Sequence, residues 1–222
     1  MSTLDGMAAA PIVTPPTRAE WVDGLLRKAI LHGALLPGEK LYAERLADQW
    51  GVSATPVRET FQRLAGEGLV VIEPQRGARV APLSVADAAE IYELRLLLDP
   101  VALEHSVQAA AGDAAFAAEV EAAHTAVARR HRAIADYHDA HKAFHLALVS
   151  RCPNVRLVRQ VAELLDHSLR FQAIGAVTVR RGNPAEEHRV LAAAAVAGRA
   201  TDAATVLRAH LQATLDAVRA SG

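Results

Sequence analysis

The stretch from Pro37 to Val80 constrains the fold of this chain more than any other part of the sequence. Its pattern predicts helices over 42–50 and 54–67, separated by a turn that contains glycine. Two β-rich segments follow, 69–73 and 78–80, and a sequence with proline and glycine joins them. Two helices around such a turn, followed by a hairpin, are typical of a winged helix-turn-helix.

Helical spacing separates the inward from the outward residues of this module. Ala47 and Trp50 share one side of the first helix, and Val57, Phe61 and Leu64 share one side of the second. Apolar residues at these intervals form a stripe that a helix buries against its neighbours. We therefore expect these side chains to form the core of a small domain.

The polar residues left outside this core are suited to DNA. The N-terminal half of a recognition helix enters the major groove, where arginine can form two hydrogen bonds with guanine. The wing tip can approach a neighbouring groove. The candidate DNA-contacting residues are Lys40, Arg45, Ser53, Thr55, Arg58, Arg76 and Gly77. The alternative is a three-helix module that packs against a protein, because such patterns also occur in protein-binding modules.

Net charge gives the DNA interpretation little support. Residues 1–80 contain nine Lys or Arg and nine Asp or Glu, so their formal charge is 9 − 9 = 0. Binding would depend on a local arrangement of cations and helix N-termini, which a dimer would double.

Composition places the chain among globular proteins that work in a reducing compartment. Its 222 residues are 51% hydrophobic, enough for the cores of two domains. The single cysteine, Cys152, excludes an internal disulfide. Residues 1–16 lack the features of a signal peptide, and no run of about 18 apolar residues occurs. We expect a soluble, cytoplasmic protein.

The predicted fold is mainly α, with the winged module followed by an all-α bundle of six helices. Thr17 and Glu20 form a capping-box pattern at the first helix. The expected division is a disordered tail over 1–16, a DNA-binding domain over 17–80, a linker over 81–84 and an effector-binding and dimerisation domain over 85–219. The expected bundle helices cover 85–110, 113–132, 136–150, 154–174, 184–197 and 201–219.

Four of the ten histidines have spacings that suggest a metal site. His141 and His145 are four residues apart on one helix, so they share a face. His188 and His210 lie at equal distances from the turn near Gly198. In an antiparallel hairpin these two residues would stand level, so four imidazoles could meet inside the bundle.

The competing interpretation is that these histidines are ordinary core residues with hydrogen bonds. His138 shares a face with His141 and His145, and it could replace one of them. Spacing alone leaves both questions open.

The chain resembles a known family of bacterial transcription regulators. Its N-terminal part is similar to the winged-helix domain of the GntR family through Leu36-Pro37-Gly38-Glu39-Lys40-Leu41, Leu46-Ala47, Gly51-Val52-Ser53, Thr55-Pro56-Val57-Arg58-Glu59 and Gly68-Leu69-Val70. Ala54 stands where the family usually has an arginine. We expect Arg45 or Lys40 to compensate for that arginine.

Residues 84–219 resemble the all-helical, FCD-type ligand-binding domain of the FadR-like branch of this family. The motifs that carry this resemblance are Ile91-Tyr92-Glu93-Leu94-Arg95, Phe144-His145, Pro153-Asn154, Glu187-His188 and Arg208-Ala209-His210-Leu211. The resemblance implies a divalent ion bound by His145, His188 and His210. His141 occupies the position where the metal-containing members have aspartate.

Imidazole ligands favour zinc, with nickel or cobalt as alternatives. Because ligands must be neutral to bind, we expect the metal to be released as the pH falls through about 6.

Arg95 is the candidate effector-binding residue. The resemblance implies that its guanidinium binds a carboxylate. The alternative is an ion pair with Asp99, four residues along the same helix.

These features together predict a dimeric repressor that binds a palindromic operator and senses a small organic acid at its metal site. No catalytic residue is predicted. Two alternatives are a metal-dependent hydrolase and a direct metal sensor. The sequence leaves open the acid, the operator, the metal and the direction of the response.

Overall fold

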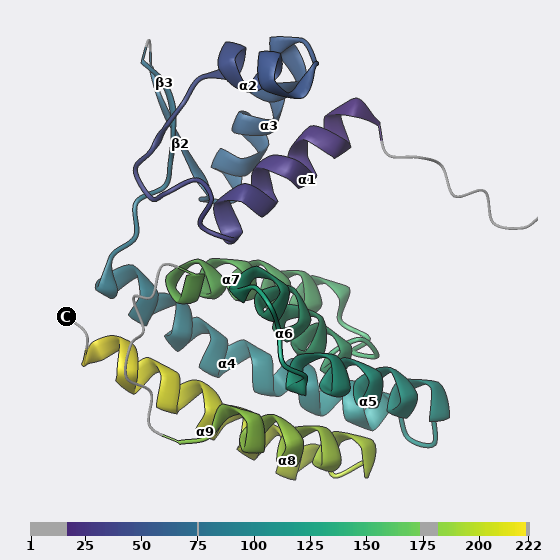
Figure 1. The fold of residues 1–222 in the computed structure, drawn as a ribbon. Helices are drawn as coiled ribbons and strands as arrows, with labels where there is room; N and C mark the ends of the chain where they lie inside the picture. Colours follow the sequence, from purple (N-terminus) through teal and green to yellow (C-terminus); the bar gives the residue numbers. More distant parts are fainter. Residues whose placement is uncertain (1–16, 75, 174–181, 221–222) are drawn as a thin grey trace, which may run out of the picture.

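The computed structural model describes residues 17–74, 76–173 and 182–220 of the chain. In this part of the chain, a head of helices and short strands lies against a larger helical bundle (Figure 1). The head contains α1 (Arg18–Leu31), β1 (Lys40–Leu41), α2 (Ala43–Trp50), α3 (Ala54–Gly66), β2 (Val70–Glu73) and β3 (Gly77–Val80). The bundle contains α4 (Val85–Ala109), α5 (Ala114–Ala128), α6 (Ile134–Leu148), α7 (Val155–Ala173), α8 (Pro184–Val196) and α9 (Ala200–Arg219). The predicted mainly α fold with a winged head is confirmed.

The head contains one strand more than the sequence predicted. Its antiparallel sheet has the order β1-β3-β2, with Lys40 opposite Arg79 and Val71 also opposite Arg79 on the other side of β3. β1 has only two residues, too few for alternation to reveal.

The core of the head follows the predicted periodicity closely. Val57 and Leu64 are fully buried, and Phe61 and Ala47 are nearly so. α1 adds Val22, Leu26 and Ile30 to this core, whereas Trp21 of the same helix remains 43% exposed.

Helix boundaries are set by caps that the sequence shows. The Thr17 hydroxyl accepts from the amide of Glu20 while the Glu20 carboxylate accepts from the amide of Thr17, so the capping box is complete. Ser84 caps α4 by accepting from the amide of Asp87. Asn183 caps α8, so the turn before this helix is fixed just ahead of His188.

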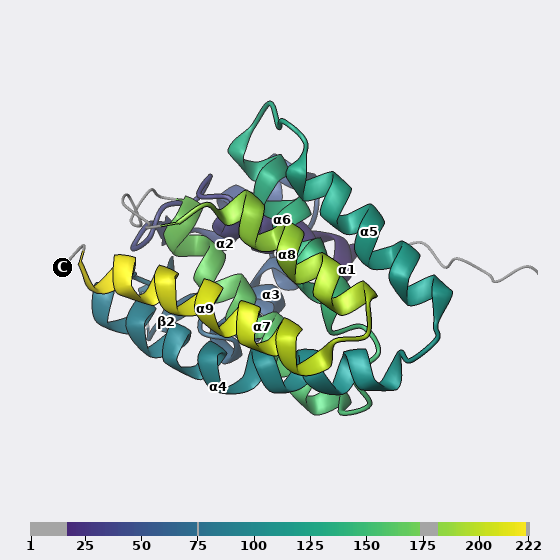
Figure 2. The same ribbon diagram turned by 90° about the horizontal axis from the view of Figure 1, so that it is seen from below.

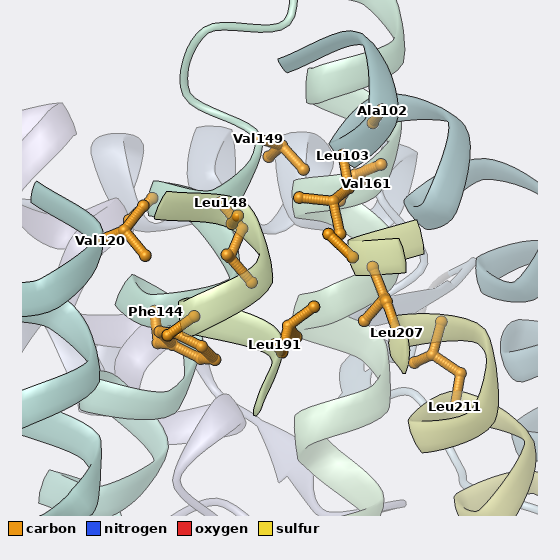
Figure 3. Close-up of a cluster of buried hydrophobic side chains, with 14 of the residues drawn as sticks. Ala102, Leu103, Val120, Phe144, Leu148, Val149, Val161, Leu191, Leu207 and Leu211 are labelled. Atoms are coloured by element: carbon orange, nitrogen blue, oxygen red, sulfur yellow. The ribbon is translucent and has the colours of Figure 1, made fainter. Parts of the chain in front are cut away.

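α4 is the longest helix of the bundle, and α9 and α7 pack along it. α5 lies beside α6 and α8 (Figure 2). Fully or almost fully buried side chains from several helices meet between them, among them Phe144, Leu148, Leu191 and Leu207 (Figure 3). This apolar core lies directly beside the histidines described below, because the Phe144 ring contacts those of His145 and His188.

The head rests on α6 and α7, which form the side of the bundle that faces it (Figure 1). The contacts to α7 are polar. Arg27 of α1 lies 3.6 Å from the Asp166 carboxylate, and His167 Nε2 donates to the Glu67 carbonyl at 2.8 Å. The Arg170 guanidinium donates to the carbonyl of Ala81, in the connector between the two units.

The carboxylate of Asp139 on α6 contacts α1 and the turn after it in the head. Asp139 accepts from His32 Nε2 at 2.8 Å and lies 3.3 Å from Lys28 Nζ. Lys142, one turn further along α6, pairs with Asp166 of α7. None of the described helices is both long enough and apolar enough to cross a membrane.

Candidate functional site

The four histidines singled out by spacing meet at one point of the bundle. α6 provides His141 and His145, α8 provides His188 and α9 provides His210, and all four are buried. Ring centroids are 4.5 Å apart for His141 and His145, 5.0 Å for His141 and His188, and 4.9 Å for His188 and His210. We call these four residues the histidine cluster.

The spacing of the ring nitrogens suits a metal ion. One nitrogen from each ring lies within 4.8 Å of the other three, and the Nε2 atoms of His141 and His145 are 3.2 Å apart. Two nitrogens bound to zinc at about 2.1 Å are separated by about 3.4 Å in a tetrahedron and about 4.2 Å when opposite. The His141 and His145 nitrogens are already near the tetrahedral separation, and side-chain rotations that shorten the widest separation by up to about 1.4 Å (4.8 − 3.4) would bring the cluster to coordination distances.

One buried nitrogen at the cluster has no partner. Nδ1 of His141 is shielded from solvent and has no hydrogen-bond partner among the described residues. Because Nε2 of the same ring faces His145, this outer nitrogen calls for a water or another hydrogen-bond partner, while Nε2 is the donor available to an ion. The cluster thus has the donor type, number and spacing of a transition-metal site.

A carboxylate supports the cluster from outside. Glu187 Oε2 lies 2.8 Å from Nδ1 of His210, which leaves Nε2 of that ring for a ligand. A carboxylate on the outer nitrogen fixes the tautomer and orientation of a metal-binding histidine. Glu187 was not among the site residues predicted from the sequence. The hairpin symmetry that pairs His188 with His210 would also have placed Glu187 near the same level.

Tyr137 is a second residue that the sequence interpretation missed. Its ring stacks on His141 with centroids 5.7 Å apart and planes at 30°. Tyr137 precedes His141 by four residues, so the helical spacing that pairs His141 with His145 also contained this signal. His138 lies apart from the cluster and lines a pocket between α6 and α1 with Leu31 and Lys28.

Arg95 is buried in an ion pair. Its Nε and Nη2 atoms lie 2.9 and 2.8 Å from Asp99 Oδ2, and Nη1 donates to Ser168. The alternative ion pair with Asp99 is therefore present, but it is buried in the bundle, and the effector-binding role of Arg95 stays a prediction. Leu94 and Leu97, its apolar neighbours, point away from the interior and are 48% and 64% exposed.

Burial controls the electrostatics of the site. It lowers the pKa of His141 and His145 well below the ordinary value, and the neighbouring imidazoles and Arg95 lower it further. Burial raises the pKa of Asp99, against the opposing effect of Arg95. The imidazoles of His141 and His145 thus stay neutral, as metal binding requires, at a more acidic pH than exposed histidines would. The release expected near pH 6 should accordingly occur at a lower pH.

The predicted DNA-contacting residues lie on the outer surface of the head. Lys40, Arg45, Ser53, Thr55, Arg58, Arg76 and Gly77 are all exposed. Arg58 and Gly77 line one groove of about 340 Å³ between the recognition helix α3 and the wing formed by β2 and β3. Ser53 occupies the N-cap position of α3, but its side chain makes no capping bond and remains available.

Arg58 is paired with Glu44 of α2. Both side chains are mostly exposed, at 62% and 67%, so water and salt weaken the pair. Contact with a base would require Arg58 to leave this partner.

The depressed pKa values predict that metal-free protein loses stability in mild acid. Below the unfolded-state pKa of about 6.5, the unfolded chain binds protons that folded His141 and His145 do not. The free energy of unfolding should therefore fall with decreasing pH, by up to about 1.4 kcal/mol per pH unit for each of the two groups. Urea unfolding of chelator-treated protein from pH 7.5 to 5.5 measures this dependence.

The double variant His141→Gln/His145→Gln should show a flatter dependence, and exposed His105→Gln should leave it unchanged. An equally steep loss in the double variant would contradict this assignment.

Two family models match the chain. Residues 18–80 match bacterial regulatory proteins of the gntR family, and residues 90–213 match the FCD domain. FCD domains are known for metal binding, which agrees with a histidine cluster able to hold an ion.

Regulators from several bacteria are similar over most of the chain. The HTH-type transcriptional regulator BphR of Paraburkholderia xenovorans (strain LB400) is 31% identical over 221 residues, covering 96% of this chain and 89% of the relative. The HTH-type transcriptional repressor GlaR of Escherichia coli (strain K12) is 27% identical over 199 residues, covering 84% and 89%.

Solved structures share the whole fold. Escherichia coli McbR/YncC superposes with a TM-score of 0.79 at 20% identity, over 93% of this chain and 99% of that one. A GntR transcriptional regulator from Rhodococcus sp. RHA1 gives 0.77 at 24% identity, over 92% and 99%. With the matched head and the matched bundle, these likenesses show that the chain belongs to the GntR family of bacterial transcription regulators, with an FCD domain at its C-terminus.

Proposed function

We propose that this regulator is a cytoplasmic, dimeric repressor that senses a small carboxylate at a metal ion held by His141, His145, His188 and His210. The observation that carries the proposal is the convergence of these four buried imidazoles from three helices. Nothing else in the described bundle gathers so many neutral donors at one point.

The donor set favours zinc, nickel or cobalt. A bound divalent ion would supply a Lewis-acidic centre with its full +2 charge, since four neutral imidazoles do not offset it. Glu187 would hold the His210 ring in place, and Phe144 would close the inner side of the cluster. Arg95 lies close enough to depress the pKa of His141 and His145, but Asp99 already binds it. An acid that contacts Arg95 would have to share it with that carboxylate.

The exposed residues of the head support the proposal that this regulator binds DNA. The recognition helix α3 exposes Thr55 and Arg58 near its N-terminus, and the wing exposes Arg76 beside Gly77. Specific readout by Arg58 and backbone contacts by Lys40, Arg45 and Ser53 would compensate for the absence of a general positive field.

An exposed apolar stripe on α4 supports the dimer. Leu94, Leu97 and Val101 lie at helical spacing and are 48%, 64% and 39% exposed. A two-fold contact through this face would join two heads for the two halves of a palindromic operator.

α6 would carry the signal to the head. This helix provides His141 and His145 to the cluster, and Asp139 of the same helix contacts α1 of the head. A ligand that shifts α6 would change this contact and, with it, the position of the head.

Two other functions would require different features of the site. A direct metal sensor would respond to zinc without any acid and would need no pocket for one. An open pocket reaches His188 and offers a route for an organic ligand, which favours sensing of an acid. A hydrolase would need a free base at the cluster. Glu187 instead faces the outer nitrogen of His210, where it orients a ligand.

Metal binding should depend on each imidazole. A four-ligand zinc site contributes about 10–16 kcal/mol, so removing one ligand should weaken binding roughly 100-fold. We expect calorimetric titration with zinc to show about one ion per chain, and His188→Ala and His210→Ala to lose that affinity. Glu187→Gln should weaken binding by about 10-fold through its effect on His210.

Exposed His105→Ala is the matched control, and circular dichroism checks the fold of every variant. Unchanged zinc affinity in both ligand variants would rule out the proposed site.

Sequence-specific DNA binding should depend on Arg58. A bidentate contact with guanine is worth about 1–3 kcal/mol, so Arg58→Ala should weaken binding to a selected operator by roughly 10-fold or more. Lys40→Ala should weaken specific and non-specific binding alike and reduce the salt slope by about 1. Fluorescence anisotropy with an operator selected from a random library measures both effects.

Arg199→Ala, in the turn before α9, is the control and should bind as the unaltered protein does. If Arg58→Ala kept full preference for the operator, α3 would not be the reading helix.

The effect of the acid on DNA affinity should depend on Asp139. Asp139→Asn removes the charge that holds His32 and Lys28, but it leaves the cluster and the DNA-facing surface intact. We therefore expect DNA and zinc affinities within about 2-fold of the unaltered protein, and a several-fold smaller change of DNA affinity on adding the acid. The acid used is the tightest binder in a thermal-shift screen of hydroxy acids, sugar acids and dicarboxylates.

Asp136→Asn is the matched control, since Asp136 is exposed on the first turn of the same helix. An equal response in both variants would remove α6 and Asp139 from the signalling route.

A further inference from the structure

A pocket at the turn between α5 and α6 opens onto the histidine cluster. Its volume is about 420 Å³, within the range of small-molecule sites. His188, a member of the cluster, forms part of its wall, and so does Tyr137, whose ring stacks on His141. The pocket therefore reaches the histidine cluster from outside, at His188 and Tyr137.

The charge of this outer pocket has one sign. Among the described lining residues, every titratable side chain other than Tyr137 is basic: His124, Arg129, His131, Arg132 and His188. Arg129 and Arg132 are exposed, and neither forms an ion pair with a described residue. This contrasts with Arg95 in the interior, whose charge Asp99 already offsets.

Between the histidine cluster and the two arginines, the wall is apolar and aromatic. Val127 and Ile134 line it, and Tyr137 lies between the rings of His131 and His141, at 5.7 Å from each. His131 Nε2 donates to the carbonyl of Ala126, which fixes this ring at the turn. A ligand in the pocket would thus meet a cationic centre at its inner end, a hydrophobic middle and two guanidinium groups at its outer end.

We propose that the effector is a dianionic organic acid, and that Arg129 and Arg132 at the outer end of this pocket bind its second anionic group. This inference rests on the proposed function, because the first carboxylate would bind at the histidine cluster when that cluster holds its ion. The two arginines select for the second charge and do not contribute to metal binding.

The test compares straight-chain monocarboxylates and dicarboxylates of equal length, from four to eight carbons, by calorimetry with zinc-loaded full-length protein. One charge-assisted contact at a partly exposed site should give the best dicarboxylate about a 10-fold advantage over its monocarboxylate partner. Arg129→Ala/Arg132→Ala should abolish this advantage while zinc affinity stays unchanged. Arg130→Ala should retain it, because Arg130 is exposed in the same turn but does not line the pocket.

The other possible results distinguish the role of the outer arginines from the sensing function itself. Equal binding of the two kinds of acid, or an equal loss in Arg130→Ala, would overturn the role of the outer arginines and leave carboxylate sensing in place. Failure of both kinds of acid to bind zinc-loaded protein would overturn the sensing function as well.

Discussion

The burial of four imidazoles around one point is the constraint on which this structure depends. Each ring has left water, and none of the four can be charged there without repelling the others. A divalent ion would suit such a site, because it binds neutral imidazole. In the absence of an ion, the depressed pKa values of His141 and His145 predict that the cluster weakens the bundle in acid.

The cluster also links parts of the chain that are far apart in sequence. α8 and α9 form a hairpin that brings His188 level with His210, and α6 lays His141 and His145 across it. α6 reaches the head through Asp139, and α7 reaches it through Asp166 and His167. One helix, α6, thus carries two residues of the cluster and a carboxylate that contacts the head. The polar nature of these contacts suits an interface that changes arrangement.

Much of this could be predicted from the sequence because it rests on local rules. Periodicity and caps placed the helices, and the i, i+4 spacing with hairpin symmetry placed all four histidines. The same rules apply to Tyr137, one turn before His141, and to Glu187, beside His188, although neither was predicted to join the cluster. Trp21 and the direction of Leu94 and Leu97 could not be predicted, since helical periodicity marks an apolar face without saying whether a neighbouring element covers it. The burial of the Arg95 and Asp99 pair depends on Ser168, 73 residues away, and spacing carries no information on such contacts.

The proposed sensing function requires that these four imidazoles bind a metal ion. Zinc K-edge X-ray absorption on the reconstituted full-length protein tests this most directly. We predict a first shell dominated by nitrogen at about 2.0–2.1 Å with the multiple scattering of four imidazoles, joined by oxygen when an acid is bound. A shell dominated by sulfur or oxygen in the absence of acid, or one with fewer than three imidazoles, would contradict it.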